Sequence, residues 1–262
     1  MLLQDKRILV TGVLTENSIA AAVARIAQQQ GAEVVLTGHG RALSLTRLVA
    51  QRLPVSCDVL EMDVTSPEQI DATAAELERR WGAVDGVVHA VGFAPPAAMG
   101  GGFLTAPWED VATALRISTY SFAALGRAFG PLLAKSEHGC LVGLDFDARQ
   151  AWPGYDWMGV AKAGLESCCR YLAAALGPQG TRVNLVAAGP LRTTAMRAIG
   201  GADRLASLWE RNAPLGWDAD DASSVGQVVC TLLSPWLPGV TGEVLHVDGG
   251  AHAVAFAPEL VG

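Results

Sequence analysis

Tyr155 and Lys162 are the residues whose types and spacing most clearly suggest chemistry. The chain has three tyrosines, at 120, 155 and 171, and three lysines, at 6, 135 and 162. Seven residues is nearly two helical turns, so both side chains would share one face about 10 Å apart along the axis. The lysine could then hold a cofactor ribose while the phenol reaches a substrate carbonyl. The alternative is a surface tyrosine near an unrelated lysine.

A second candidate site follows the first apolar run, where Thr11-Gly12 leads through a polar turn to Ser18. A glycine at a strand end and a following helix N-terminus form an anion site, because free N–H groups and the helix dipole meet there. Ser18 is a candidate N-cap that could also hydrogen-bond a phosphate. The full G-x-G-x-x-G fingerprint is absent, so an ordinary strand–helix turn is the alternative.

The second and third apolar runs end at Thr37-Gly38-His39-Gly40-Arg41 and at Asp63-Val64. At the second, a carboxylate normally binds the 2′-hydroxyl of NAD, and a basic residue accommodates the 2′-phosphate of NADP. No carboxylate is present and Arg41 is near, so these residues lean towards NADPH. His39 could stack on adenine or lie in a solvated loop. Asp63 could accept the adenine amino group or begin the next helix.

Two later runs also end in residues that suit a dinucleotide. Gly92 would let the backbone approach a ribose closely. After Gly189-Pro190, the Leu191 amide could bind a carboxamide, because Pro190 has no N–H, and Thr193 could reach a phosphate. Together, the Gly, Asp and Thr residues at several strand ends indicate a dinucleotide site more strongly than any one of them does.

Alternating strands and helices must position these residues. The expected strands are Arg7–Thr11, Glu33–Thr37, Val55–Asp63, Gly86–Val91, Cys140–Asp145, Arg182–Ala187 and Glu243–Val247. The expected helices are Ser18–Gln30, Arg41–Leu53, Pro67–Trp81, Trp108–Lys135, Tyr155–Leu176 and Ala222–Leu233. This order predicts an α/β fold, a doubly wound Rossmann-type parallel sheet of about seven strands with helices on both faces. Without a linker or composition break, residues 1–262 are expected to form one domain, with ligands beyond the carboxyl ends of the strands.

Composition excludes several other classes of protein. A net charge of −7 argues against general nucleic-acid binding. No apolar run reaches the roughly 18–20 residues of a membrane helix, and the first residues contain no hydrophobic signal core. Five cysteines lack metal-type spacing, so reduced structural thiols are expected and no metal site. We expect a cytoplasmic protein.

The spacing of the Tyr155–Lys162 pair also narrows the reaction. Ordinary ketoreductases of the short-chain dehydrogenase/reductase type share a Tyr-x₃-Lys pair and a serine about thirteen residues before the tyrosine. In this chain the position of that lysine is Gly159 and the position of that serine is Val142. A longer spacing suits hydride delivery to the β-carbon of a conjugated thioester, while the Tyr155 hydroxyl donates a hydrogen bond to the carbonyl oxygen. That oxygen gains charge as an enolate forms, so a preorganised neutral donor stabilises the transition state most.

Several motifs carry a resemblance to a known family. They are Leu144-Asp145-Phe146-Asp147 followed by Trp152-Pro153-Gly154-Tyr155-Asp156-Trp157-Met158-x₃-Lys162, then Gly12-x₅-Ser18-Ile19-Ala20, His89-Ala90-Val91-Gly92-Phe93, Asn184-Leu185-Val186-Ala187-Ala188-Gly189-Pro190-Leu191-Arg192-Thr193 and Asp248-Gly249-Gly250-Ala251-His252. They resemble the enoyl-acyl-carrier-protein reductases of the short-chain dehydrogenase/reductase superfamily, in the actinobacterial branch with the mycobacterial long-chain enoyl reductase. The likeness covers almost the whole chain.

The resemblance implies reduction of the α,β double bond of an enoyl thioester, on acyl carrier protein or CoA, by NADH in fatty-acid synthesis. NADPH stays open because of His39 and Arg41. The implied catalytic residues are Tyr155, Lys162 and Phe146, the last beside the nicotinamide. The expected cofactor-binding residues are Gly12, Ser18, Ile19, His39, Asp63, Val64, Gly92, Lys162, Leu191 and Thr193. The expected substrate-contacting residues are Phe93, Met99, Met158, Met196, Leu205 and Trp209.

The segment 194–214 is expected to cover the substrate pocket. Leu205, Leu208 and Trp209 would form one apolar helix face, and Gly200-Gly201 could be the hinge of a mobile lid. Core packing is the alternative. The resemblance implies that this segment is longer in the mycobacterial relatives, so we do not expect their preference for very long acyl chains. Arg197, Arg204 and Arg211 could steer an acidic carrier protein, or form a solvated helix face.

Two other functions stay open. The same machinery could reduce an enone or enoyl group in a secondary-metabolite pathway. A non-catalytic sensor of nicotinamide redox state is also possible, although a pure binder needs no phenol aimed at a substrate. The resemblance further implies a homotetramer, for which the terminal strand Glu243–Val247 is a candidate interface.

Overall fold

The computed structural model describes residues 1–197 and 202–255 and contains one seven-stranded parallel sheet. The strand order is β3-β2-β1-β4-β5-β6-β7, with all neighbouring pairs parallel. The strands are β1 Arg7–Val10, β2 Glu33–Gly38, β3 Val59–Glu61, β4 Gly86–His89, β5 Cys140–Asp145, β6 Arg182–Ala188 and β7 Val244–Val247. The predicted α/β fold, a doubly wound Rossmann-type sheet, is confirmed.

Both faces of the sheet are buried, which explains why its strands are apolar without strict alternation. In β1, Ile8 and Val10 join one hydrophobic cluster and Leu9 joins the cluster on the opposite face. Each such side chain contributes about 1.5–3 kcal/mol when fully buried. The two clusters fix which helices cover which face.

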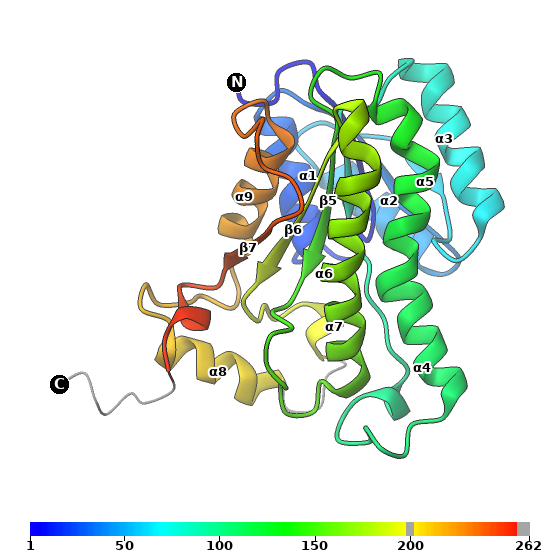
Figure 1. The fold of residues 1–262 in the computed structure, drawn as a ribbon. Coiled ribbons are helices and arrows are strands. Elements are labelled where there is room, and N and C mark those ends of the chain that lie inside the picture. Colours follow the sequence, from blue (N-terminus) through cyan, green and yellow to red (C-terminus); the bar gives the residue numbers. More distant parts are fainter. Residues whose placement is uncertain (198–201, 256–262) are drawn as a thin grey trace.

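Helices cover the sheet in two layers (Figure 1). One layer consists of α1 (Ile19–Gln29), α2 (Ala42–Arg52) and α9 (Ser223–Leu233). The other consists of α3 (Pro67–Trp81), α5 (Ser121–Leu133) and α6 (Asp156–Leu176), with α4 (Trp108–Leu115) continuing beyond α5. The short helices α7 (Thr194–Arg197) and α8 (Ala202–Asn212) lie beyond the arrowheads of the strands. Single helical turns occur at η1 Pro96–Ala98, η3 Gly177–Gln179 and η4 Ala251–Ala253.

Two sequence-based predictions of elements were wrong in extent. The third strand was expected over Val55–Asp63 but spans only Val59–Glu61. It is an edge strand that pairs with β2 alone, and Val55, the first residue of the expected strand, is 64% exposed. The helix expected over Trp108–Lys135 is interrupted by one π-helical turn, η2 (Arg116–Tyr120).

The strand order reverses between β1 and β4, because the chain leaves the sheet centre in opposite directions from these two strands. In such a sheet the ligand crevice lies outside the carboxyl ends of the strands at this switch. A third hydrophobic cluster, which includes Trp152, Tyr155, Met158 and Trp209, lies near this end. The fold therefore predicts where a site should be.

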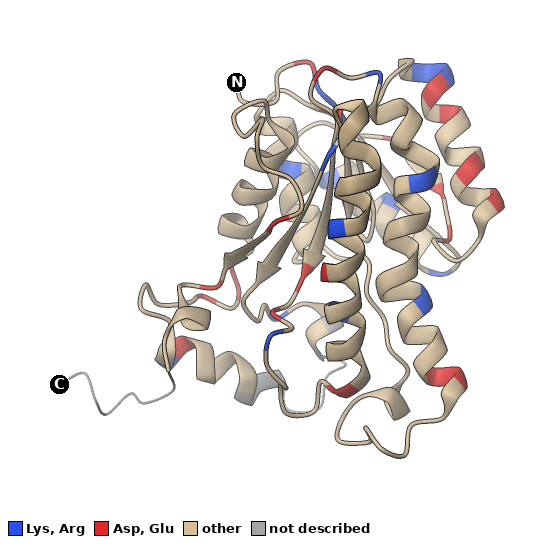
Figure 2. Cartoon of the chain, in the orientation of Figure 1, with Lys and Arg blue, Asp and Glu red and all other residues tan. Residues whose placement is uncertain are grey.

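Figure 2 shows charged side chains of both signs on the outer helices, and along α3 the acidic residues precede Arg79 and Arg80 in the last turn. Within the described residues, no helix combines the length and apolar character needed to cross a bilayer. In that same part of the chain, no group of three His, Cys, Asp or Glu side chains is arranged to hold a metal ion.

Candidate active site

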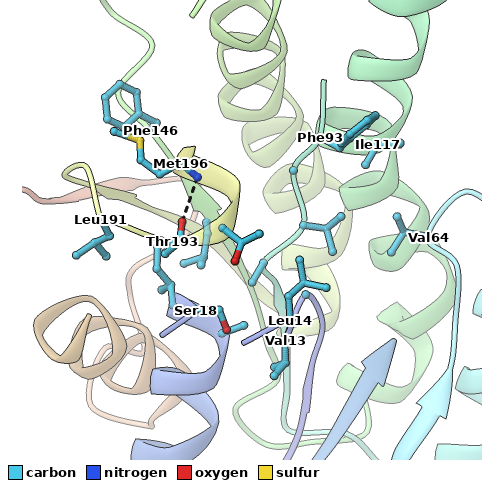
Figure 3. A pocket seen from close by; sticks show the side chains of 18 of the residues that line it. Val13, Leu14, Ser18, Val64, Phe93, Ile117, Phe146, Leu191, Thr193 and Met196 are labelled. Carbon is cyan, nitrogen blue, oxygen red and sulfur yellow. Dashed lines mark hydrogen bonds between the residues drawn. The ribbon is translucent and has the colours of Figure 1, made fainter. Parts of the chain in front are cut away.

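A cavity of about 620 Å³ lies at the carboxyl ends of β1 to β6. It contains every residue expected to bind the cofactor, all three expected catalytic residues and all expected substrate residues except Trp209. Figure 3 shows Ser18, Val13 and Leu14 near its centre, Phe146 with Met196 on one side, and Phe93, Ile117 and Val64 on the other. The topology thus brings residues from six strands into one space.

The N-terminus of α1 opens towards this cavity. Ser18 is the N-cap: its hydroxyl accepts from Ala21 N at 3.2 Å and donates to the Thr15 carbonyl at 2.7 Å. The first-turn N–H groups of Ile19 and Ala20 have no acceptor inside the helix, and both residues line the cavity. No acidic residue occupies this turn. An anionic group can therefore bind here without repulsion.

The structure requires a glycine at position 12 for a steric reason that the sequence did not reveal. Its φ is +80°, and a Cβ at this position would lie 2.0 Å from the Ala90 carbonyl oxygen. The glycine therefore lets the ends of β1 and β4 approach each other. At Gly92, by contrast, an added Cβ would meet only Ser118 Oγ, at 3.9 Å. Packing leaves room at Gly92, on a surface that lines the cavity.

The end of the cavity at β2 and β3 is polar and partly exposed. His39 Nδ1 lies 3.6 Å from Asp63 Oδ2, and the other Asp63 oxygen accepts two hydrogen bonds from Thr65, each 2.8 Å. Burial opposes ionisation of Asp63, but the Thr65 bonds, His39 and Arg116 together lower its pKa. Ser66, not Asp63, caps α3.

Arg41 bears on the choice between NADH and NADPH. It is exposed at the start of α2 and is absent from the cavity lining. Arg41, the basic residue that favoured NADPH in the sequence, therefore gives no structural support for NADPH binding in this cavity.

The π-helical turn η2 supports the loop after β4. Ser118 is fully buried, and its hydroxyl accepts from Phe93 N at 2.9 Å and donates to Phe93 O at 3.0 Å. Ile117, from the same turn, lines the cavity. π-bulges are frequent at functional sites. Ser118 and Ile117 were not predicted from the sequence, because no local sequence pattern indicates a π-helical turn.

The loop after β6 supplies the wall opposite Ser18. Leu191 is buried, and no described residue accepts a hydrogen bond from its N–H. Thr193 Oγ1 accepts from Met196 N at 3.3 Å, the dashed line in Figure 3. A free backbone donor beside Pro190 is what a carboxamide would need, as the sequence suggested.

Tyr155 and Lys162 line the same cavity, and the helix expected over Tyr155–Leu176 is observed over Asp156–Leu176, with a distorted start. Tyr155 precedes α6 as its N-cap residue, and Asp156 has a φ of +42°. The segment from 155 to 162 is thus not one regular helix. Asp156 is held in this strained conformation by Gly101 N, which donates to its Oδ2 at 2.6 Å. Tertiary contacts, not helical period alone, aim the phenol into the cavity.

The Tyr155 hydroxyl has no hydrogen-bond partner among the described residues. Burial, and secondarily the nearby Asp145 carboxylate, raise the pKa of Tyr155 well above its ordinary value. The phenol is therefore neutral and can donate a hydrogen bond. Lys162 donates to the Leu144 carbonyl at 2.8 Å, and burial lowers its pKa while Asp145 opposes this.

Aromatic rings surround Phe146 at this end. Its centroid lies 5.1 Å from the ring of Tyr155, 5.6 Å from Trp152 and 5.6 Å from Trp209. Trp209, which was expected to contact the substrate, is 2% exposed and is not among the residues that line the cavity. It packs against Trp152 and behind Phe146, because the inner face of α8 joins the third hydrophobic cluster.

The remaining wall beside Phe146 is apolar. Met99, Met158 and Met196 are buried and line the cavity, together with Leu205 from α8. Unbranched methionine side chains adapt to irregular apolar ligands. The cavity therefore has a polar end, at His39 and Asp63, and an apolar end beside Tyr155.

Part of the expected lid lies outside the described residues. The Gly200-Gly201 hinge belongs to the undescribed stretch 198–201, and the side chains of Arg197 and Arg204 are likewise not described. Arg211 is exposed in the last turn of α8. Arg192 ties the described part of this region together, with ion pairs to Glu210 at 2.9 Å and Asp220 at 2.6 Å.

Comparisons with known proteins agree with these observations. Residues 12–252 match the family model described as Enoyl-(Acyl carrier protein) reductase. The chain is 47% identical to the enoyl-[acyl-carrier-protein] reductase [NADH] of Mycolicibacterium smegmatis, over 95% of this chain and 97% of that protein. It is 42% identical to the protein of that name from Mycobacterium avium, over 95% and 97%, and 37% identical to the one from Neisseria meningitidis, over 98% of each. The chain therefore belongs to the enoyl-[acyl-carrier-protein] reductase family, as its motifs predicted.

Proposed function

We propose that this protein reduces the α,β double bond of a trans-2-enoyl thioester with NADH, in fatty-acid synthesis. The observation that carries the proposal is the neutral Tyr155 hydroxyl, which has no partner among the described residues in a cavity shared with Lys162. Relatives that cover almost the whole chain are named enoyl-[acyl-carrier-protein] reductase [NADH], which supports both the reaction and the cofactor.

The cavity fits a dinucleotide in several independent ways. The α1 N-terminus offers N–H groups to a diphosphate, and Asp63 can accept from an adenine amino group. At the opposite end, the free Leu191 N–H suits a carboxamide, and Lys162 can bind ribose hydroxyls. Asp145 lies beside Lys162 on the same wall of the cavity.

The chemistry that NADH supplies when bound is a hydride, which adds to the β-carbon of the enoyl thioester. Tyr155 donates its hydrogen bond to the thioester oxygen, which becomes an enolate oxygen as the double bond is reduced. Because this oxygen gains negative charge, the hydrogen bond strengthens towards the transition state. Uptake of a proton at the α-carbon completes the reduction. Phe146 and Met158 exclude water beside the reacting carbons.

The acyl chain lies along the apolar end of the cavity, against Met99, Met158, Met196 and Leu205. Residues 1–262 act as one catalytic domain, in which the segment 194–214 is a lid over this end. Leu205 in the cavity lining supports the lid, while the buried Trp209 limits how freely α8 can move. The thioester is carried by acyl carrier protein or CoA, and the protein acts as a cytoplasmic homotetramer.

The reaction is tested by following the loss of NADH absorbance with trans-2-enoyl-CoA and enoyl-carrier substrates in a series of chain lengths, and with NADPH in parallel. We expect turnover with NADH and a preference for acyl chains shorter than those of the mycobacterial long-chain enzymes. Binding of NADH without turnover of any enoyl thioester would overturn the proposal and favour a redox sensor. Turnover confined to cyclic or aryl enones would place the enzyme in secondary metabolism instead.

A further inference from the structure

A buried carboxylate without hydrogen bonds stands beside the expected catalytic lysine. Asp145 is the last residue of β5 and lines the cavity, yet its side chain is completely inaccessible to solvent. Neither carboxylate oxygen accepts a hydrogen bond that meets the distance and angle criteria from a described residue, although the neighbouring Phe146 N–H is close enough to lower the pKa of Asp145. A buried charge in this state is costly unless a cation or a ligand compensates it.

Lys162 is the cation that can compensate it. Its Nζ lies 4.0 Å from Asp145 Oδ1, and no other Lys, Arg or His nitrogen of the described residues lies this close to Asp145. The ammonium group is itself buried, and its hydrogen bond to the Leu144 carbonyl adds no negative charge. A lysine in an apolar site tends to lose its proton unless an anion is near.

Other nearby groups do not provide that anion. Glu166, on α6, is only half-buried and accepts a long bond of 3.4 Å from Ala148 N. Asp147 faces away towards His246, whose Nε2 lies 3.5 Å from its Oδ1. His89 is buried beside Lys162, and its pKa is lowered to about 3, mainly by burial, so it is neutral. Asp145 is therefore the carboxylate whose position matches the lysine.

Resting on the proposed function, we propose that Asp145 is a positioning residue: its carboxylate keeps Lys162 charged and holds its ammonium group where it binds the nicotinamide ribose. Asp145 acts through Lys162, so its loss weakens cofactor binding before it affects the acyl substrate. The role follows from two largely buried groups of opposite charge that lie 4.0 Å apart on the wall of the cavity.

Titration of the pair supports this role. Burial raises the pKa of Asp145 to about 7, with Lys162 opposing the rise and Glu166 and Asp147 adding to it. The other titratable groups near the pair are Tyr155, Cys169 and His89. Asp145 should therefore lose its charge as the pH falls through about 7, and NADH should bind more weakly on the acid side.

The experiment is a binding cycle at neutral and higher pH with four proteins: wild type, Asp145→Asn, Lys162→Met and the double variant. NADH affinity is measured by the fluorescence of the bound dinucleotide, and folding by thermal unfolding. We expect Asp145→Asn to weaken NADH binding about 10- to 100-fold, as for a lost charge-assisted interaction, while thermal unfolding remains a single cooperative transition. In the Lys162→Met background the same change should have no further effect.

Glu166→Gln is the matched control, because it removes a neighbouring carboxylate outside the cavity lining. It should leave NADH affinity within about twofold, the range of a surface change. Equal affinity of wild type and Asp145→Asn would overturn the proposal, as would a full additional loss in the Lys162→Met background. Should Asp145→Asn not fold, Lys162→Met decides: a loss of NADH affinity no larger than that of Glu166→Gln would contradict the pairing.

The outcomes separate this inference from the proposed function. Wild type that fails to reduce enoyl thioesters refutes the function, whatever the binding data show. Wild type that reduces them while Asp145→Asn binds NADH normally refutes only the role of Asp145.

Discussion

The polar side chains at the two ends of the cavity differ in their exposure to solvent and in their hydrogen bonds. At the β2–β3 end, the His39 and Asp63 side chains are 56% and 31% exposed, and Asp63 has hydrogen-bond partners of its own. At the β5–α6 end, Lys162 and Asp145 are 10% and 0% exposed, and the Tyr155 hydroxyl and Asp145 lack hydrogen-bond partners among the described residues. Water-screened pairs contribute little, whereas buried incomplete ones depend strongly on each partner. The polar groups that carry out the proposed chemistry therefore lie at the buried β5–α6 end, where the loss of one group has the larger effect.

The largest expected effect is structural and lies behind the β5–α6 end. Trp209→Ala should lower the free energy of unfolding by about 3–5 kcal/mol, because it removes a buried ring packed on Phe146 and Trp152. Urea unfolding measures this. Trp236→Ala is the control, since Trp236 is 75% exposed and should change stability by no more than about 0.5 kcal/mol. Equal stability of the two variants would show that α8 is not anchored through Trp209.

The next effect concerns the phenol. Tyr155→Phe should lower kcat by about 10²- to 10³-fold, the usual cost of removing one oxyanion donor, while NADH affinity stays as in wild type. Tyr171→Phe, at a side chain that is 78% exposed, should have no effect on either quantity. Because burial raises the pKa of Tyr155 above its ordinary value of 10.0, the rate should show no loss from its ionisation up to that pH. A Tyr155→Phe enzyme at full speed contradicts the donor role.

The exposed end should respond more weakly. Asp63→Asn is expected to weaken NADH binding by about 2- to 10-fold, the range of one neutral hydrogen bond. Because the folded pKa of Asp63 is lowered, its carboxylate adds stability above its unfolded pKa and loses that contribution as the pH falls through the folded value. Thermal unfolding should therefore show a small loss at neutral pH that disappears in acid. A loss of affinity as large as that of Asp145→Asn would erase the contrast between the two ends.

The smallest expected effect is at Arg41. Arg41→Gln should leave the ratio of NADH to NADPH turnover within about twofold, because an exposed residue outside the cavity lining contributes little. Steady-state rates with both nucleotides measure the ratio. A tenfold change in that ratio would mean that Arg41 reaches the ribose after all.

The sequence predicted most of the fold because buried parallel strands and amphipathic helices leave strong local patterns. The residues that were expected from the strand ends to bind the cofactor, from Ser18 to Thr193, all line the cavity. What failed depended on distant contacts. The short β3 follows from its edge position, and the break of the helix at η2 has no local signal.

The catalytic end shows the same limit. Helical spacing predicted that Tyr155 and Lys162 share one cavity, but not the positive φ of Asp156, whose carboxylate accepts a hydrogen bond from Gly101 N, 55 residues away. Asp145 stood inside a recognised motif, yet only the three-dimensional structure reveals that it is buried, unpartnered and beside Lys162. Trp209 lies on the expected apolar face of its helix, but whether that face meets a ligand or a neighbouring ring is decided by tertiary packing.

The most direct measurement follows a labelled hydride. Wild type is incubated with a trans-2-enoyl-CoA and NADH carrying deuterium at the transferable position, and the deuterium in the product is located by NMR. Our account predicts deuterium at the β-carbon of a saturated acyl thioester. Deuterium on a carbon that bears a new hydroxyl group would mean that the cavity delivers hydride to a carbonyl, and would contradict the central claim.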